Sequence, residues 1–477
     1  MNKVFVSSLS VYGLSILMPS YSAQIKENKK PNIIVVFTDD QGFQDLGCYG
    51  SPKIKTPNID RMATEGIRFT DFYVSASVCS PSRASLLTGR MPVNNGLVNV
   101  IFPETDGMSS DETTIAEMLK PAGYKTACFG KWHVGDTEGH LPTDQGFDTY
   151  FGIPYSNDMF ISPSQKFSSS VQLLNSYTLE KAKADQAFVK ENLRNTASIK
   201  AQGLKELCPL LEGKEIVEYP CDQSTLTQRY FDRSIAFIKD AGKQPFFIYI
   251  TPAMPHIPLH ASTAFKGTSA RGLYGDVVEE IDMNIGKLLA FLKKQHLDKN
   301  TLVIFSSDNG PWIEHGEEAG CALPFRDGKF SNYEGGVRTP CIMWWPGKIP
   351  AETVSNQVAT TMDFLPTIAH YTGAKLPKVK LDGINLSKHL ENPATPIPRD
   401  TYYYSKGKVI WGIRKGDWKY LPHGGARNAD KTSPPELYNL KKDISESTNL
   451  YSQYPEIAKE LAAIMKSYNQ TITKNEN

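Results

Sequence analysis

A cysteine followed closely by proline and arginine is the first feature whose residue types could carry chemistry. In Cys79-Ser80-Pro81-Ser82-Arg83, Pro81 suits the first turn of a helix, which places Cys79 at the helix N-terminus. The unpaired N–H groups and the dipole at that end favour a bound anion. The segment therefore predicts an anion site beside Cys79, although a structural cysteine before a helix would give part of the same pattern.

Two pairs of oxygen-bearing side chains form a second candidate group. Asp39-Asp40 and Asp308-Asn309 each follow a short apolar run. Carboxylate and amide oxygens are hard ligands, which suit calcium or magnesium better than a soft metal. Such pairs taken alone are usually turn or cap residues, so their role depends on what lies near them.

Basic side chains complete the candidate set. Lys131 and His133 share one short segment, His256 lies between Pro255 and Ile257, and Lys329 follows a glycine. A histidine can act as a general acid when its pKa lies near the working pH. A lone histidine is more often structural, so these residues also depend on their surroundings.

Three strongly apolar runs are expected to bring these groups together. Residues 32–37, 246–250 and 302–305 predict buried strands, with helix-like segments such as 115–119 and 277–292 between them. This alternation predicts an α/β fold, a large mixed and mostly parallel sheet sandwiched by helices. Each run ends in or leads to acidic, amide or histidine residues. Because ligands in open α/β sheets bind beyond the carboxyl ends of strands, one shared site is expected.

The segment around Cys79, extended through Thr88-Gly89-Arg90, resembles the signature of the type I, formylglycine-dependent sulfatases of the alkaline phosphatase superfamily. The segments at residues 142–148 and 150–156 are similar to the arylsulfatase A and N-acetylgalactosamine-6-sulfatase branch. The resemblance runs from residue 31 to about residue 450 and implies an alkaline phosphatase-like fold. It also implies that a formylglycine-generating maturation enzyme converts Cys79 to 3-oxoalanine.

The resemblance implies a metal ligand set as well. One Ca²⁺ per chain would be bound by Asp39, Asp40, the modified Cys79, Asp308 and Asn309. The ion would polarise the sulfate and favour ionisation of the attacking hydroxyl. One hydroxyl of the hydrated aldehyde would attack sulfur, and the other would remain available to expel sulfate.

Roles for the histidines and the cationic residues follow from the same resemblance. His133 would take the proton from the second hydroxyl, and His256 would act as an acid near the leaving oxygen. Lys131 and Lys329 would hold sulfate oxygens, and Arg83 would support the formylglycine, which together gives preorganised positive charge.

One position departs from the family pattern. Asp327 stands where the family frequently has glycine, so the loop that carries Lys329 is expected to differ locally.

The N-terminus and the changes in composition predict the domain organisation. Residues 1–23 are typical of a signal peptide, because Asn2-Lys3 precedes an apolar run at residues 4–18 and small residues follow. That run is too short to span a bilayer and no later stretch is long enough, which predicts a soluble protein that is periplasmic or secreted.

The mature chain is expected to form two domains. Residues 24–395 would form the catalytic α/β domain, in which the polar segment 160–225 is an insertion. That insertion either shapes a substrate rim or is a surface excursion without a role. Residues 396–477 would form a smaller C-terminal domain of antiparallel sheet plus a helix at 456–468.

Charge and cysteine content argue against nucleic-acid-binding, zinc-binding and redox proteins. The chain of 477 residues has 52 basic and 51 acidic residues, which gives no support for a nucleic-acid or polybasic membrane partner. A local basic cluster could still bind an anionic substrate. The seven cysteines are an odd number, and Cys208 and Cys221 could pair across a short loop. No CxxC pair occurs, so zinc and redox motifs have weak support.

The resemblance implies a sulfuric ester hydrolase that acts on a sulfated carbohydrate, weakly favouring galactose or N-acetylgalactosamine. A formylglycine-dependent phosphonate monoesterase or phosphodiesterase is the nearer alternative, and Asn309 argues against it because that branch tends to have histidine there. A catalytically inactive glycan-binding protein is the other alternative. Four residues, Ser156, Asn157, Asp158 and His423, are candidate sugar contacts or ordinary loop residues. The sequence does not fix the sugar, the sulfate position, exo or endo action, or the oligomeric state.

Overall fold

A central sheet of eleven strands runs through the protein, in the order β12-β2-β11-β10-β1-β9-β4-β5-β7-β8-β6. The computed structural model describes residues 1–2 and 30–475, so the predicted signal peptide lies outside the described residues apart from its first two. The strands are β1 (Asn32–Thr38), β2 (Ile67–Phe69), β4 (Lys125–Gly130), β5 (Thr149–Gly152), β6 (Lys166–Leu173), β7 (Leu210–Glu212), β8 (Glu215–Tyr219), β9 (Phe246–Thr251), β10 (Thr301–Ser307), β11 (Cys341–Trp344) and β12 (Thr353–Ser355).

The middle of the sheet is parallel and its edges are mixed. Strand β1 pairs in parallel with β10 and β9, and β4 pairs in parallel with β9 and β5. Antiparallel pairs join β10 to β11 and β5 to β7. The predicted mixed, mostly parallel sheet is therefore confirmed.

Strand β1 explains how the sheet acquires two apolar faces. All seven of its residues are buried. Successive side chains of a strand point to opposite faces. Ile33, Val35 and Phe37 accordingly join one hydrophobic core, whereas Ile34 and Val36 join the other.

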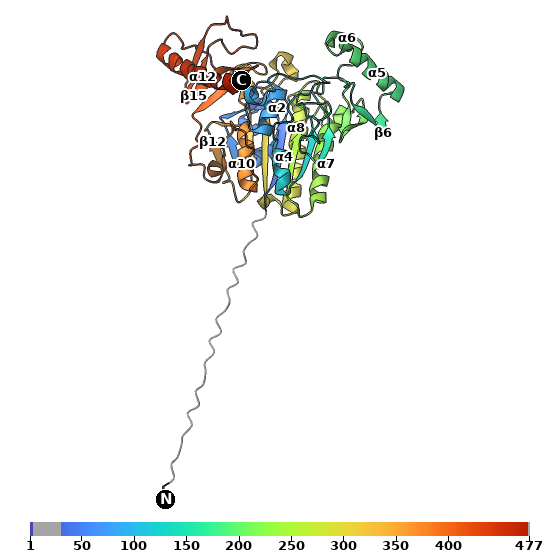
Figure 1. Ribbon diagram of the computed structural model, residues 1–477, viewed down its shortest axis with the longest axis horizontal. Helices are drawn as coiled ribbons and strands as arrows, with labels where there is room; N and C mark the ends of the chain where they lie inside the picture. The colour runs from blue at the N-terminus through green and yellow to red at the C-terminus, as the bar shows by residue number, and fades with distance from the viewer. Residues whose placement is uncertain (3–29, 476–477) are drawn as a thin grey trace.

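Helices cover both of these faces. Helices α2 (Cys79–Thr88), α4 (Ile115–Leu119) and α10 (Phe364–Thr372) contribute buried side chains to the first core. Helices α1 (Pro57–Thr64), α7 (Gln223–Ala241) and α8 (Leu273–Lys294) contribute to the second. The result is the predicted sandwich of helices around a sheet (Figure 1). Between these elements lie α3 (Pro92–Asn95), η1 (Phe43–Asp45), η2 (Gly47–Tyr49), η3 (Lys120–Ala122), η4 (Asp298–Asn300), η5 (Ile313–Glu318), η6 (Thr361–Asp363), α9 (Glu334–Val337), α11 (Ser387–Glu391) and the paired strands β3 (Phe72–Tyr73) and β13 (Ala359–Thr360).

The segment predicted as an irregular insertion, residues 160–225, contributes regular structure to the sheet. Strands β7, β8 and β6 extend the edge beyond β5. Helices α5 (Leu179–Asn192) and α6 (Thr196–Ala201) protrude from that end of the molecule (Figure 1). Strand β6 has only exposed and half-buried residues, and β8 mixes exposed and buried ones, so neither gave a continuous apolar run in the sequence.

The C-terminal part folds as a second, smaller sheet. Strands β14 (Thr401–Lys406), β15 (Val409–Lys415), β16 (Trp418–Leu421) and β17 (Glu436–Asn439) form four antiparallel neighbours, and α12 (Pro455–Asn475) packs against them. The predicted antiparallel sheet plus helix is confirmed. The domain boundary at residue 396 stays a prediction.

A buried charged network joins the small sheet to helix α9 and strand β3. The carboxylate of Glu334 lies 2.9 Å from Lys419 Nζ, and Lys419 also contacts Glu446 at 2.7 Å. The hydroxyls of Tyr73 and Tyr404 donate to the same Glu334 carboxylate at 2.5 and 2.6 Å. Because every partner is buried and hydrogen-bonded, this network fixes the helix α9 that follows the loop of Lys329.

Candidate active site

The carboxyl ends of four neighbouring parallel strands carry most of the predicted site residues. Strands β10, β1, β9 and β4 are adjacent in the sheet and run in the same direction. The residues are Asp39 and Asp40 after β1, Lys131 and His133 after β4, His256 after β9, and Asp308 and Asn309 after β10. The shared site that the strand endings predicted is therefore present in the structure.

Cys79 is the first residue of helix α2, as the proline position predicted. Its Sγ lies 3.4 Å from Asp39 Oδ1, and its side chain is buried. Every other residue of α2 is also buried. The helix therefore has its N-terminal N–H groups at a buried position beside the carboxylate of Asp39.

The oxygen donors are close enough to share one cation. One ligand atom each from Asp39, Asp40, Cys79 and Asp308 lies within 4.8 Å of the others. The Nδ2 of Asn309 donates to Asp40 at 2.6 Å, and its Oδ1 is buried without a hydrogen-bond partner. An unpartnered buried oxygen is costly unless something binds it. The set of hard oxygen donors therefore fits a calcium-type ion.

Three buried cations surround these carboxylates. Lys131 Nζ lies 2.5 Å from Asp39, Arg83 lies 2.7 Å from Asp308, and Lys329 Nζ lies 2.8 Å from Asp40. All of these side chains are buried. The site thus holds fixed positive charge next to the N-terminus of α2, which suits an anionic group.

The pKa values of the Asp39 and Asp308 carboxylates are shifted in opposite directions. Burial alone would raise the pKa of Asp39, but Lys131 and the other nearby cations hold it well below its ordinary value. Burial and the neighbouring charge of Asp39 raise the pKa of Asp308 to about 7. Like charges confined in a dry site resist ionising together, and a bound divalent cation would relieve that repulsion.

His256 faces this cluster through its Nε2 atom. Nε2 lies 3.6 Å from Asp40 Oδ2 and 3.5 Å from Ser156 Oγ. Nδ1 contacts two acceptors, Asn157 Oδ1 at 3.1 Å and the Ile257 carbonyl at 2.5 Å. Because acceptors fix the proton on Nδ1, Nε2 is the atom available for proton exchange in the site. Burial, followed by the charge of Lys329, lowers the pKa of His256.

His133 has the opposite tautomer. Its Nε2 donates to the carbonyl of Ile101 at 3.0 Å, and its Nδ1 is buried without a partner. Burial, followed by the charge of Lys131, lowers the pKa of His133 well below its ordinary value. The ring is therefore neutral, and Nδ1 carries a free lone pair.

Left-handed backbone conformations cluster around the site. Asp40, His133 and Asp327 have φ values of 57°, 60° and 61°. Such conformations are uncommon for residues other than glycine and are concentrated at functional sites. The left-handed conformation of Asp327 explains why the family frequently has glycine at this position. Glycine adopts that conformation freely, and aspartate adopts it here. Gly130 (φ 128°) is more restricted, since a Cβ there would lie 2.0 Å from the Thr251 carbonyl.

The four candidate sugar contacts have different surroundings. Ser156 accepts from Lys131 Nζ at 3.3 Å, and Asn157 contacts His256, so both lie in the site. Asp158 is paired with Lys205 at 3.7 Å. The ring of His423 lies 5.2 Å from that of Trp411 in the small sheet.

Two contributors to the site were missed from the sequence. The ring of Trp312 lies 5.9 Å from that of His256, and Lys329 Nζ lies 4.9 Å over the Trp312 ring. Its place three residues after Asn309 could have marked it. The carbonyl of Ile101, which fixes His133, has no sequence signal because every residue has one.

The two cysteines predicted to pair are adjacent. The Sγ atoms of Cys208 and Cys221 are 3.2 Å apart, and the N–H of Cys221 donates to the Cys208 carbonyl at 3.0 Å. Both residues are free thiols in this structure.

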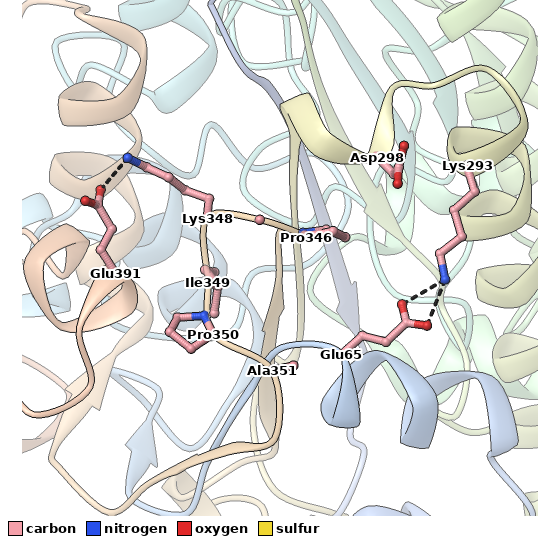
Figure 2. Close-up of a pocket in the computed structure, with 10 residues that line it drawn as sticks. Glu65, Lys293, Asp298, Pro346, Lys348, Ile349, Pro350, Ala351 and Glu391 are labelled. Atoms are coloured by element: carbon pink, nitrogen blue, oxygen red, sulfur yellow. Dashed lines mark hydrogen bonds and ion pairs between the residues drawn. The ribbon is translucent and has the colours of Figure 1, made fainter.

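A separate cleft lies at the end of the sheet away from the carboxyl ends of these parallel strands. It has a volume of about 700 Å³ and is lined by residues next to the start of β10 and the end of β11 (Figure 2). Its lysines are already paired, Lys293 with Glu65 at 2.8 Å and Lys348 with Glu391 at 3.0 Å. This cleft therefore offers little unpaired charge to a ligand.

Comparison with known protein families decides the family to which the chain belongs. A family model described as Sulfatase matches residues 31–374, and one described as N-sulphoglucosamine sulphohydrolase, C-terminal, matches residues 325–472. The chain belongs to the sulfatase family. The sulfatase hydrolyses sulfate esters, which confirms the predicted enzyme class.

Curated relatives support the branch that the sequence indicated. Human arylsulfatase A is 37% identical to this sulfatase over 461 residues, which cover 91% of this chain and 86% of the relative. Rat N-acetylgalactosamine-6-sulfatase is 36% identical over 406 residues, which cover 82% of this chain and 71% of the relative.

Solved structures share the whole architecture of the sulfatase. The PsFucS1 sulfatase from Pseudoalteromonas sp. matches with a TM-score of 0.79 at 31% identity, covering 94% of this chain and 92% of that one. Ps i-CgsB in complex with k-i-k-neocarrahexaose matches with a TM-score of 0.72 at 30% identity, covering 92% and 93%. Among the described residues, none of the helices combines the length and apolar character needed to cross a membrane.

Proposed function

We propose that this sulfatase is an exported enzyme that removes sulfate esters from sulfated carbohydrates, using a formylglycine made from Cys79 and one bound Ca²⁺. The observation that carries the proposal is the position of Cys79. It begins a buried helix, faces Asp39 at 3.4 Å, and lies among the oxygen donors and cations of the site. When present, formylglycine supplies a hydrated aldehyde as nucleophile, and calcium polarises the sulfate and acidifies the attacking hydroxyl.

The metal would be held by Asp39, Asp40, Asp308, Asn309 and the modified residue 79. The unpartnered Oδ1 of Asn309 supports this assignment. The nature of the donors supports calcium, because the Asp and Asn side chains and the hydrated aldehyde of the modified residue 79 all offer oxygen.

The cations of the site bind and orient the sulfate. Lys131 reaches Asp39 from the end of β4, and Lys329 reaches Asp40 from the loop before α9, so a sulfate placed beside Cys79 would meet both ammonium groups. Arg83 holds Asp308 and donates to the Lys131 carbonyl at 3.1 Å. Such fixed charge stabilises negative charge that develops during transfer without reorganisation.

The two histidines handle protons at different atoms. His256 would deliver a proton from Nε2 to the leaving sugar oxygen, because its Nδ1 is occupied by Asn157 and Ile257. His133 would accept a proton at Nδ1, because its Nε2 is occupied by Ile101. The geometry thus separates an acid and a base within one site.

Three observations support a carbohydrate as substrate. One similar enzyme is named for N-acetylgalactosamine 6-sulfate chemistry, and one similar structure holds a neocarrahexaose. In this chain, Trp312 stands beside His256 with part of its ring exposed, and aromatic rings are suited to cover the apolar face of a sugar. Galactose or N-acetylgalactosamine is the favoured sugar type.

Export is supported by the N-terminal sequence alone. Residues 1–23 have the positive start, apolar run and small residues of a signal peptide. Mass spectrometry of the protein from its producing cells should find a mature N-terminus after Ser22 or Ala23, in the periplasm or medium. An uncleaved chain in the cytoplasm would contradict export.

Sulfate release decides the catalytic proposal. The matured, calcium-loaded enzyme should release sulfate from 4-nitrocatechol sulfate and from at least one sulfated galactose or N-acetylgalactosamine compound, with mass spectrometry of the Cys79 peptide run alongside. A chain carrying an unmodified Cys79 is the control and should be nearly inactive. Faster turnover of an aryl phosphodiester than of the aryl sulfate would favour the phosphonate monoesterase or phosphodiesterase class instead.

A further inference from the structure

A pocket of about 290 Å³ lies beside the candidate active site and is not used by the chemistry described above. Its lining is mainly apolar, with Phe102, Met159, Phe160 and Ile199 as the large side chains. The volume is close to the lower end of small-molecule sites, which suits one compact ring-sized group rather than a long chain.

Two residues that line this pocket are chain neighbours of residues that contact His133 and His256. Phe102 follows Ile101, whose carbonyl accepts from His133 at 3.0 Å. Asp158 lines the pocket and follows Asn157, whose side chain lies 3.1 Å from His256. A group bound in the pocket would therefore lie next to the position of the leaving sugar.

Another wall comes from the segment that the sequence marked as an insertion. Helix α6 (Thr196–Ala201) contributes Ile199 and Lys200, and the chain after it contributes Lys205. Lys205 is paired with Asp158 at 3.7 Å, whereas Lys200 has no ion-pair partner within residues 30–475. The mouth of the pocket therefore has one uncompensated positive charge.

Phe102 is the large apolar residue of this pocket that is exposed. Half of its side chain, 50%, is open to solvent although it is large and apolar. An exposed aromatic ring next to an active site is a common feature of ligand binding, because the ring covers an apolar face of the ligand and removes it from water.

We propose that this pocket is a subsite for the sugar that adjoins the sulfated sugar in an oligosaccharide, with Phe102 covering the ring and Lys200 binding a sulfate or carboxylate on it. The inference rests on the proposed glycan sulfatase function and extends it to substrate length. It assigns a role to α6, and it predicts that the enzyme prefers a charged oligosaccharide over a sulfated monosaccharide.

The test compares long and short substrates. The probes are a neocarrahexaose and a chondroitin sulfate hexasaccharide, each with its matching sulfated monosaccharide, and 4-nitrocatechol sulfate, which carries no neighbouring sugar. For the better glycan, kcat/KM should be at least about 10-fold higher for the hexasaccharide than for the monosaccharide, because remote binding energy is used in the transition state.

Two substitutions then locate the effect. Phe102→Ala should lower kcat/KM for the hexasaccharide about 10-fold and change that for 4-nitrocatechol sulfate by less than about 2-fold. Lys200→Gln should lower the hexasaccharide value by about 5-fold, and by less when the neighbouring sugar carries no sulfate. Leu376→Ala and Lys190→Gln are matched controls, because both residues are exposed and line neither the pocket nor the site.

The outcomes separate this subsite from the proposed function. Unchanged hexasaccharide kinetics in Phe102→Ala and Lys200→Gln, or equal losses on the aryl sulfate, would overturn the subsite while leaving glycan desulfation in place. Turnover of the aryl sulfate with no release from any glycan would contradict the glycan function, and the subsite with it.

Discussion

The side-chain oxygen of Asn157 lies 3.1 Å from Nδ1 of His256. The amide is oriented by its other end, because Nδ2 donates to Gln223 Oε1 at 3.0 Å and to the Pro258 carbonyl at 3.0 Å. Asn157 therefore fixes both the tautomer and the ring direction of His256, and it does so from outside the oxygen cluster.

Substitution of Asn157 should lower kcat through His256. Asn157→Ala leaves only the Ile257 carbonyl on Nδ1, so we expect kcat on 4-nitrocatechol sulfate to fall about 10-fold, less than the loss expected for removing an acid catalyst itself. The pH profile of kcat should also change, which a purely structural effect would not produce. Wild-type kcat with an unaltered pH profile would show that Asn157 has no positioning role.

Calcium should stabilise the folded protein as well as support activity. The unpartnered Oδ1 of Asn309, and the burial and neighbouring Asp39 charge that raise the pKa of Asp308 to about 7, both predict that the folded site binds the ion. At a calcium concentration of about 100 times Kd, linkage predicts about 2.7 kcal/mol of stabilisation. Differential scanning calorimetry should show the rise in Tm, and Asn309→Ala should weaken it.

Magnesium provides the comparison for that measurement. It requires a tighter octahedral ligand arrangement, so it should raise Tm less than calcium at equal concentration. An identical Tm with calcium, with magnesium and after chelation would contradict the metal site.

Maturation of Cys79 should precede folding. All ten residues from Cys79 to Thr88 are buried, and Arg83 within them is paired with Asp308. A maturation enzyme that reads this segment cannot reach it in the native protein. Folded protein with unmodified Cys79 should therefore stay unmodified when incubated with the maturation enzyme, whereas a peptide spanning the segment should be converted. Mass spectrometry distinguishes the two, and conversion of the folded protein would require local unfolding of α2.

The sequence predicted the positions of the candidate catalytic and metal-binding residues better than it predicted the residues that surround them. The apolar runs of β1, β9 and β10 are buried on both faces, so their ends could be assigned to one edge of a parallel sheet. That argument placed Asp39 and Asp308 together. The resemblance to a family motif then supplied their expected role as metal ligands.

The surroundings of the site could not be predicted in the same way. Strand β6 has only exposed and half-buried residues, β8 mixes exposed and buried ones, and both carry polar side chains, so no apolar run marked them. The Ile101 carbonyl acts through its backbone, which no side-chain pattern reveals. Phe102 is recognisable only once tertiary packing has brought it near the histidines, whereas Trp312 had the weak signal of its place after Asn309.

Cys208 and Cys221 should form a disulfide in protein from an oxidising compartment. Their Sγ atoms are 3.2 Å apart, and each thiol would lose one hydrogen. Closing a loop of this length would stabilise the fold by about 3 kcal/mol in a chain-entropy account. Peptide mapping without reduction should recover the two peptides linked, and Cys128, which is buried, serves as the unlinked control. Alkylation of both thiols without prior reduction would contradict the link.

Asp45 should make stability depend on pH. Burial raises its pKa from 3.8 to about 6, against hydrogen bonds from Tyr274 and from the N–H groups of Cys321 and Gly42. The folded-state pKa is the higher one, so the stabilising contribution is complete below about pH 4 and is lost as pH rises through about 6. The difference corresponds to about 3 kcal/mol at most.

A substitution isolates this contribution from the other titrating groups. Asp45→Asn removes the ionisation, so the unfolding free energy of the wild type minus that of Asp45→Asn should fall between about pH 4 and pH 6 and be flat outside that range. Urea unfolding at several pH values measures the difference. A difference that stays constant across the range would show that Asp45 keeps its ordinary pKa, with its three donors offsetting the cost of burial.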